Sequence, residues 1–268
     1  EFAHAKYSAM RERSVGLGVM GLHSYFQQKN IPFGSVMSKV WNKKIFKNIQ
    51  EKVDKASKDL AEERGACPDA EEFGIKERFS NKTAIAPTAS ISIICGGASP
   101  GIEPIAANSY THKTLSGSYN VRNKYLSKIL DKYKKNTDEV WSSITTNQGS
   151  VSHLDFLSNE EKETFKTAFE IDQKWIVELG ADRTPYISQA QSVNVFVPAD
   201  VHKKDLHQLH FQAWKKGLKS LYYCRSKSIQ RAENINAGSS TDVTKNVYSN
   251  KKESSNEDNK YEECLSCQ

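Results

Sequence analysis

The sequence closes on two cysteines, in Cys264-Leu265-Ser266-Cys267-Gln268. Thiols at this spacing can exchange with a disulfide or can supply half of a tetrahedral zinc site. A closed zinc site needs four ligands, and the remaining cysteines, Cys67, Cys95 and Cys224, are isolated from one another. Exposed free thiols are a liability, so the sequence favours a redox-active pair over a zinc site or two incidental cysteines.

The segment that carries this pair has a composition of its own. After Arg231 the residue types shift to Ser, Asn, Lys, Glu and Asp, which cannot bury enough apolar surface to order a chain. We therefore predict a folded part over residues 1–231 and a flexible tail over 232–268. A tail of this length spans on the order of 30 Å, so the terminal dithiol can reach a distant site.

A second candidate site combines a proline, small hydroxyl residues and glycines between residues 83 and 104. Pro87 fits the first position of a helical turn, and the hydroxyl groups of Thr88 and Ser90 follow it. Exposed amide groups at such a helix start form the kind of anion site that phosphates prefer. The alternative is a Ser/Thr-rich turn that binds no ligand.

The third candidate is the adjacent pair Tyr222 and Tyr223, at the end of an expected strand. Core packing is the default explanation, but tyrosine can also relay a radical if its phenol proton has a nearby acceptor. Successive strand residues point to opposite faces. Two tyrosines on one relay path therefore require the chain to leave regular strand geometry at this point.

A glycine pattern, Gly16-x-Gly18-x-x-Gly21, formally matches the dinucleotide-binding fingerprint. The fingerprint needs a preceding buried strand and an acidic residue about 20 positions later, and neither is present. The alternative is close backbone packing where a strand passes into a helix.

The elements that would position these sites alternate between helix and strand. Apolar residues at a 3.6-residue period predict a long helix over 36–63, ended near Gly65, and further helices over 121–135 and from the capping box Ser158-x-x-Glu161 to Gly180. A strand is expected over 83–86. A strand over 191–198, a helix capped by Asp200 and a returning strand over 221–224 form a βαβ unit, which favours a parallel sheet or barrel.

Composition narrows the class of protein. The 268 residues carry 38 basic and 32 acidic side chains in a mixed order, which indicates a solvated surface and no nucleic-acid stripe. No run reaches the roughly 18 apolar residues of a membrane span. An odd count of five cysteines argues for a reducing, cytoplasmic location. The first residue is Glu1, so the true start of the protein is open.

Six groups of residues share the pattern of one known family. They are the glycine segment Arg13 to Leu22, Gly65-Ala66-Cys67-Pro68, Pro87-Thr88-Ala89-Ser90 with Gly101-Ile102-Glu103-Pro104, Gln189-x-Gln191-Ser192-x-Asn194, Gly217-Leu218-Lys219 before Tyr222-Tyr223, and Glu263-Cys264-x-x-Cys267. In these segments the chain resembles the C-terminal part of the large, catalytic subunit of class I ribonucleotide reductase.

The resemblance implies an α/β fold in which this chain supplies the later strands of a ten-stranded barrel. Tyr222 and Tyr223 would pass a radical from a small, metal-bearing subunit to an active-site thiol, and the chain itself would bind no cofactor or metal. Cys264 and Cys267 would re-reduce the active-site disulfide and then be reduced by thioredoxin or glutaredoxin. The phosphates of a ribonucleoside diphosphate would be held by the loop residues Pro87, Thr88, Ala89, Ser90 and Ile91.

Some parts of the family pattern have no match in the sequence. The regulatory region, both cysteines of the active-site redox pair and the loop with the radical cysteine lie upstream in that pattern. We therefore expect a split-gene fragment that completes its barrel with a separate N-terminal large-subunit fragment, because a half-barrel leaves unpaired strand edges. Two alternatives stay open: a non-catalytic remnant that docks the small subunit, and a free-standing dithiol oxidoreductase.

Overall fold

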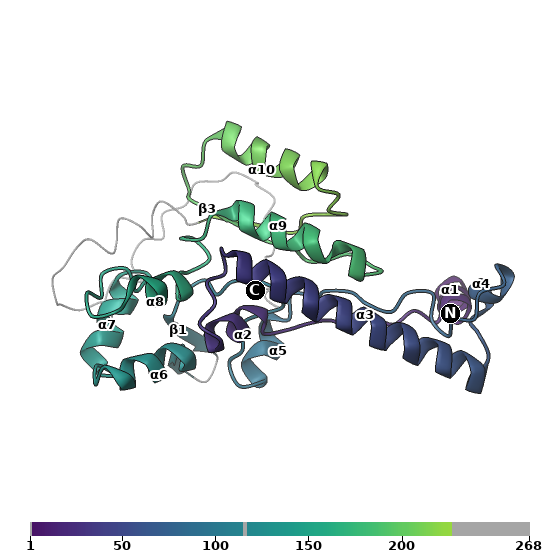
Figure 1. Cartoon of the computed structure of the whole chain (residues 1–268), viewed down its shortest axis with the longest axis horizontal. Helices are drawn as coiled ribbons and strands as arrows, with labels where there is room; N and C mark the ends of the chain where they lie inside the picture. The colour runs from purple at the N-terminus through teal and green to yellow at the C-terminus, as the bar shows by residue number, and fades with distance from the viewer. Residues whose placement is uncertain (1, 115–116, 227–268) are drawn as a thin grey trace, which may run out of the picture.

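The computed structural model describes residues 2–114 and 117–226 (Figure 1). The predicted tail over 232–268 lies outside these residues, and so do Cys264 and Cys267. The described chain begins with α1 (Ala3–Glu12), and its longest element is α3 (Val36–Arg64). The remaining helices are α2 (Leu22–Gln28), α4 (Pro68–Glu72), α5 (Ala89–Ile94), α6 (Lys124–Lys132), α7 (Asp138–Thr146), α8 (Asn159–Thr164), α9 (Gln173–Arg183) and α10 (Lys203–Lys215), with a 3₁₀ turn over Thr184–Tyr186.

Four extended segments lie side by side in parallel. Leu17 bridges Thr83, Ile85 bridges Gln191, and β3 (Val195–Val197) pairs with β4 (Cys224–Ser226). Each connection between neighbouring segments contains helix. Parallel segments joined by helical crossovers form an α/β barrel wall, as the sequence predicted.

The strands themselves are shorter than predicted. The strand expected over 83–86 is reduced to bridges at Thr83 and Ile85, and the strand expected over 221–224 begins at Cys224. The intervening helix of the βαβ unit is present as α10, but its N-cap is His202 and not Asp200. The His202 ring accepts the amide proton of Lys204, which takes the role assigned to the aspartate.

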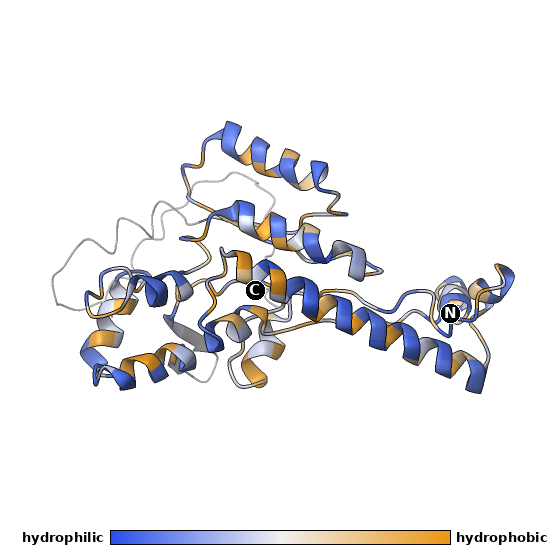
Figure 2. Ribbon diagram, viewed as in Figure 1, coloured by the Kyte–Doolittle hydropathy of each residue, from blue (hydrophilic) through white to orange (hydrophobic). Residues whose placement is uncertain are grey.

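The long amphipathic helix is confirmed as α3. Ser35 caps it by accepting a hydrogen bond from the Ser38 amide, and it ends at Gly65. Phe46 of α3 is buried in a cluster with residues of α9, whereas Met37 and Val40 near the start of the helix are exposed. Helix α9 lies between α3 and α10 (Figure 1). Figure 2 shows polar and apolar residues alternating along α3.

The single helix predicted from Ser158 to Gly180 is wrong, because the structure has two. The capping box of Ser158 and Glu161 is confirmed at the start of α8. Helix α8 then ends at Thr164, and a new helix, α9, begins after the N-cap Asp172. The break has a packing cause: Phe165 is buried in one hydrophobic cluster, whereas Ile171 is buried in another.

The helix predicted over 121–135 is also shorter than expected. Its first residues belong to an antiparallel hairpin of β1 (Ser109–Thr114) and β2 (Gly117–Arg122). Asn123 then caps α6 by accepting the amide proton of Tyr125. The hairpin gathers with α6, α7 and α8 at one end of the molecule, opposite α1 and α4 (Figure 1).

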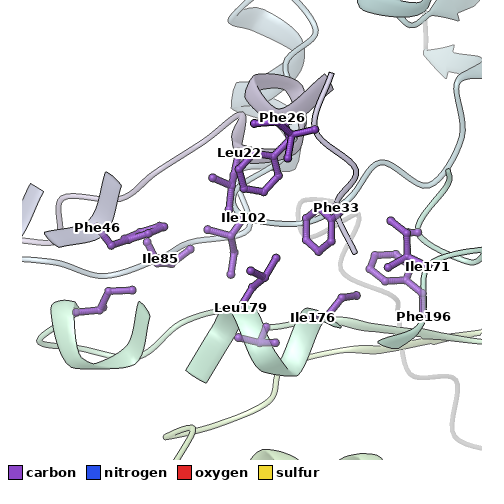
Figure 3. Close-up of a cluster of buried hydrophobic side chains, with 14 residues drawn as sticks. Leu22, Phe26, Phe33, Phe46, Ile85, Ile102, Ile171, Ile176, Leu179 and Phe196 are labelled. Carbon is purple, nitrogen blue, oxygen red and sulfur yellow. The ribbon is translucent and has the colours of Figure 1, made fainter. Parts of the chain in front are cut away.

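The described residues form three hydrophobic clusters, two large ones and a small one that joins α9 and β3 to α10. The first large cluster joins the barrel segments to α2, α3 and α9, and Figure 3 shows Leu22, Phe33, Ile102 and Leu179 converging in it. The second large cluster joins α6 to α8 around the fully buried Trp141. The part of the chain described here contains no helix that is both long and apolar enough to cross a membrane.

Candidate functional site

The loop predicted to bind phosphate connects the second barrel segment to α5. Thr88 adopts a left-handed conformation, with φ of 57°, and its Oγ1 accepts the amide proton of Gly101 at 2.8 Å. A side chain at position 101 would stand 3.0 Å from the carbonyl oxygen of Ala86, so the two loops meet backbone to backbone. The loop before α5 is therefore held in place by its contact with the segment at Gly101.

The helix start differs from the prediction by two residues. Pro87 does not occupy the first helical position, because Thr88 is the N-cap and the helix begins at Ala89. The first turn still presents its amide groups: within the described chain, the amides of Ala89, Ser90 and Ile91 have no acceptor. Ser90 and Ile91 are exposed, whereas Pro87, Thr88 and Ala89 are half-buried.

The two tyrosines form the second part of the site. Their hydroxyl groups lie 3.4 Å apart, and their ring centroids are 4.2 Å apart. The chain leaves regular strand geometry at these residues, because β4 begins only at Cys224. The requirement stated for a shared relay path is therefore met. Tyr222 and Tyr223 are 49% and 37% exposed, so they are not core residues of the described chain.

A buried polar cluster lies directly behind the tyrosines. Asn194 accepts the amide proton of Tyr223 at 2.8 Å and donates a hydrogen bond to Glu103. Burial raises the pKa of Glu103 to about 7, although the nearby charge of Arg225 and the hydrogen bond from Asn194 oppose that rise. The guanidinium of Arg225 also lies 5.5 Å from the centre of the Tyr223 ring.

Residues 101–103 thus connect the two parts of the site. Gly101 anchors Thr88 of the predicted phosphate loop, and Glu103 anchors Tyr223 through Asn194. This connection was not predicted from the sequence, where Glu103 appeared only as part of a motif. A glutamate between apolar and proline residues is the signal that could have indicated it.

A second buried network supports the barrel wall. Arg183 is 1% exposed, and its guanidinium donates to Gln191 at 2.6 Å and to Asn42 at 3.2 Å. Burial lowers the pKa of Arg183 to about 9, so the side chain stays charged at neutral pH. The network joins α3, α9 and the third barrel segment, which fixes the strand that carries Asn194.

The glycine segment Gly16-x-Gly18-x-x-Gly21 packs closely against the barrel wall, which is the alternative to a dinucleotide site that the sequence offered. A side chain at Gly18 would stand 2.9 Å from the carbonyl oxygen of Ala84. Gly21 has a φ of 83° and precedes α2. Close approach and a left-handed turn therefore account for these glycines without a dinucleotide. Within residues 2–114 and 117–226, no group of three His, Cys, Asp or Glu side chains could hold a metal ion.

Comparison with known proteins decides the family. The profile of the ribonucleotide reductase barrel domain matches residues 1–77 and 69–224. The chain belongs to the ribonucleotide reductase large-subunit family. It is 48% identical over 239 residues to the ribonucleoside-diphosphate reductase large subunit of Invertebrate iridescent virus 6, and 33% identical over 259 residues to that of Caenorhabditis elegans.

A solved ribonucleotide reductase shares the fold. The class Id alpha subunit of Actinobacillus ureae superposes with a TM-score of 0.77 at 42% identity, over 83% of this chain and 40% of that one. The alignments with the viral and nematode subunits cover 88% and 85% of this chain but only 25% and 33% of the relatives. The predicted family and barrel fold are confirmed, and this chain spans a part of the reductase large subunit.

Proposed function

We propose that this chain contributes to ribonucleoside-diphosphate reductase, which converts ribonucleoside diphosphates to 2′-deoxyribonucleoside diphosphates by radical chemistry. In this proposal it supplies the substrate phosphate loop, the radical-relay tyrosines and the dithiol shuttle. The observation that carries the proposal is the 3.4 Å contact between the Tyr222 and Tyr223 hydroxyls, which core packing does not explain.

The first role is that of Pro87, Thr88, Ala89, Ser90 and Ile91 in holding the substrate's phosphates. The three amides of the first turn of α5 have no acceptor in the described chain, and a phosphate supplies acceptors. The contact of Thr88 with Gly101 fixes the direction in which these amides point. A pre-formed set of donors binds an anion without the entropic cost of ordering a loop.

The second role is radical transfer between the tyrosines. A tyrosyl radical at one of them takes one electron and one proton from the hydroxyl of the other, so that a neutral tyrosine re-forms and the radical moves. At 3.4 Å the two oxygens are close enough for the proton to pass between them directly. The radical originates in a small, metal-bearing subunit and ends on a thiol carried by the remainder of the large subunit.

The remaining roles rest on the family resemblance. Cys264 and Cys267 return the active-site disulfide to dithiol form and are reduced in turn by thioredoxin or glutaredoxin. A separate N-terminal large-subunit polypeptide and a cytoplasmic location stay predictions. Exposed apolar residues support a protein partner: Val15 and Leu17 at the edge of the first barrel segment, and Val36, Met37 and Val40 at the start of α3.

The test combines this chain with the remainder of a large subunit and the small subunit, and measures conversion of cytidine diphosphate to its deoxy form. Tyr222→Phe and Tyr223→Phe each remove one phenol oxygen and keep the ring. Because a positioned proton-transfer group is worth about a hundredfold or more, each variant should lose at least that much turnover.

Tyr119→Phe provides the control, since Tyr119 is an exposed tyrosine of the hairpin. It should retain full turnover. If the two phenylalanine variants at 222 and 223 also retained it, the relay would be refuted. If the unmodified assembly bound the small subunit without any turnover, the chain would be the non-catalytic docking remnant instead.

A further inference from the structure

The peptide bonds around the tyrosine pair deviate from a parallel ladder in a specific way. In a regular parallel ladder, one residue both donates to and accepts from the neighbouring strand. Here the Tyr222 amide donates to the Val193 carbonyl at 2.8 Å, but it is the Tyr223 carbonyl that accepts the Val195 amide, at 2.9 Å. The strand therefore contains one extra residue opposite Asn194, which is a β-bulge.

The bulge leaves one backbone donor without a ladder partner, namely the amide of Tyr223. A buried amide without an acceptor costs about 1–3 kcal/mol. The side chain of Asn194 removes this cost, because its Oδ1 accepts the Tyr223 amide proton at 2.8 Å. Asn194 is 0% exposed, so water does not compete for this position.

Glu103 fixes the orientation of the Asn194 amide. With Oδ1 facing the Tyr223 amide, Nδ2 faces Glu103 and donates a hydrogen bond to Oε1. A flipped amide would direct Nδ2 at the Tyr223 amide, and two donors would meet. Glu103 is itself 6% exposed and comes from the loop that anchors Thr88.

We infer that Asn194 and Glu103 act as positioning residues: they stabilise the bulge that brings the phenol oxygens of Tyr222 and Tyr223 into contact. Neither side chain takes part in the transfer of the electron or the proton. The inference rests on the proposed radical relay for its functional meaning, but its geometric content is separate and can be measured in this chain alone.

The geometric test places 3-fluorotyrosine at position 222 and records its fluorine NMR signal with and without Tyr223→Phe. In the parent chain, removal of the neighbouring hydroxyl should shift the signal. In Asn194→Ala the bulge loses its acceptor, so this response should disappear. A response that persisted unchanged in Asn194→Ala would overturn the inference.

Exchanging donor and acceptor gives a sharper comparison. Asn194→Asp keeps the acceptor for Tyr223 but places a second carboxylate against Glu103, so the fluorine response should be weakened or lost. The double variant Asn194→Asp/Glu103→Gln restores a donor and an acceptor between the two side chains, and the response should return. Failure of the double variant to recover, in a folded chain, would also overturn the inference.

Asn108→Ala is the matched control for a lost buried asparagine. Asn108 is 1% exposed and donates to the backbone carbonyls of Gly149 and Phe165, away from the tyrosines. It should destabilise the chain comparably and leave the fluorine response intact. If Asn108→Ala abolished the response as well, general loss of structure would be the cause and the inference would fail.

Turnover in the full assembly separates this inference from the proposed function. Misplacement of reacting groups by about 1 Å can cost on the order of a hundredfold, so Asn194→Ala should lose turnover to that degree and the double variant should regain it. If the fluorine results hold while Tyr222→Phe and Tyr223→Phe stay active, the positioning role stands and the relay fails.

Discussion

Replacing Glu103 by glutamine should change how the stability of the chain depends on pH. The pKa of Glu103 is raised from 4.5 to about 7, mainly because burial disfavours the charged carboxylate. Between these two values the folded chain keeps a proton that the unfolded chain releases. The stability contributed by this group is therefore full below about pH 4.5, falls as the pH rises, and is lost above about pH 7.

The magnitude follows from the two pKa values. A tenfold difference in proton affinity is worth about 1.4 kcal/mol, so the difference between 4.5 and about 7 corresponds to about 3 kcal/mol. Glutamine at this position can still accept the hydrogen bond from Asn194, but it carries no charge to bury. Glu103→Gln should thus match the parent near pH 4.5 and exceed it by up to about 3 kcal/mol at pH 8.

Urea unfolding of the parent chain and of Glu103→Gln at pH 5, 6, 7 and 8 measures this difference in the free energy of unfolding. Glu51→Gln serves as the control, because Glu51 is exposed on α3 and 4.0 Å from Lys47. It should give a difference that does not grow between pH 5 and 8. An equally flat difference for Glu103→Gln would mean that burial does not raise the pKa of Glu103, and the prediction would be wrong.

Two further predictions concern the hairpin region and the terminal dithiol. In Gly149→Ala the new Cβ would stand 2.3 Å from the Cβ of Ala107 at a φ of 81°, so overpacking and left-handed strain should together destabilise the chain by about 2–5 kcal/mol in urea unfolding. The control Gly217→Ala has a φ of 76° and nothing within 4 Å of the new Cβ, so it should be destabilised by the strain alone. Equal destabilisation of the two variants would contradict the packing argument. In the full assembly, the double variant Cys264→Ser/Cys267→Ser should lose turnover driven by thioredoxin while a single turnover from pre-reduced enzyme survives, and full thioredoxin-driven turnover would rule out the shuttle.

The sequence by itself determined the features that depend on neighbours along the chain. The apolar stripe of α3, the Ser158 capping box and the βαβ unit around α10 were all predicted, because periodicity and capping are local signals. The family followed from motifs at fixed positions, which the comparisons confirm. A phosphate-binding role for residues 87–91 stays a prediction, and the helix there begins two residues later than expected.

Tertiary structure decided what depends on segments far apart in the sequence. The division between α8 and α9 follows from Phe165 and Ile171 entering different cores, which a single apolar stripe cannot reveal. The bulge at Tyr222 and Tyr223 depends on Asn194 and Glu103, which lie 29 and roughly 120 residues away from Tyr223 along the chain. Periodicity describes one chain segment at a time, so only packing could show that these residues meet behind the tyrosine pair.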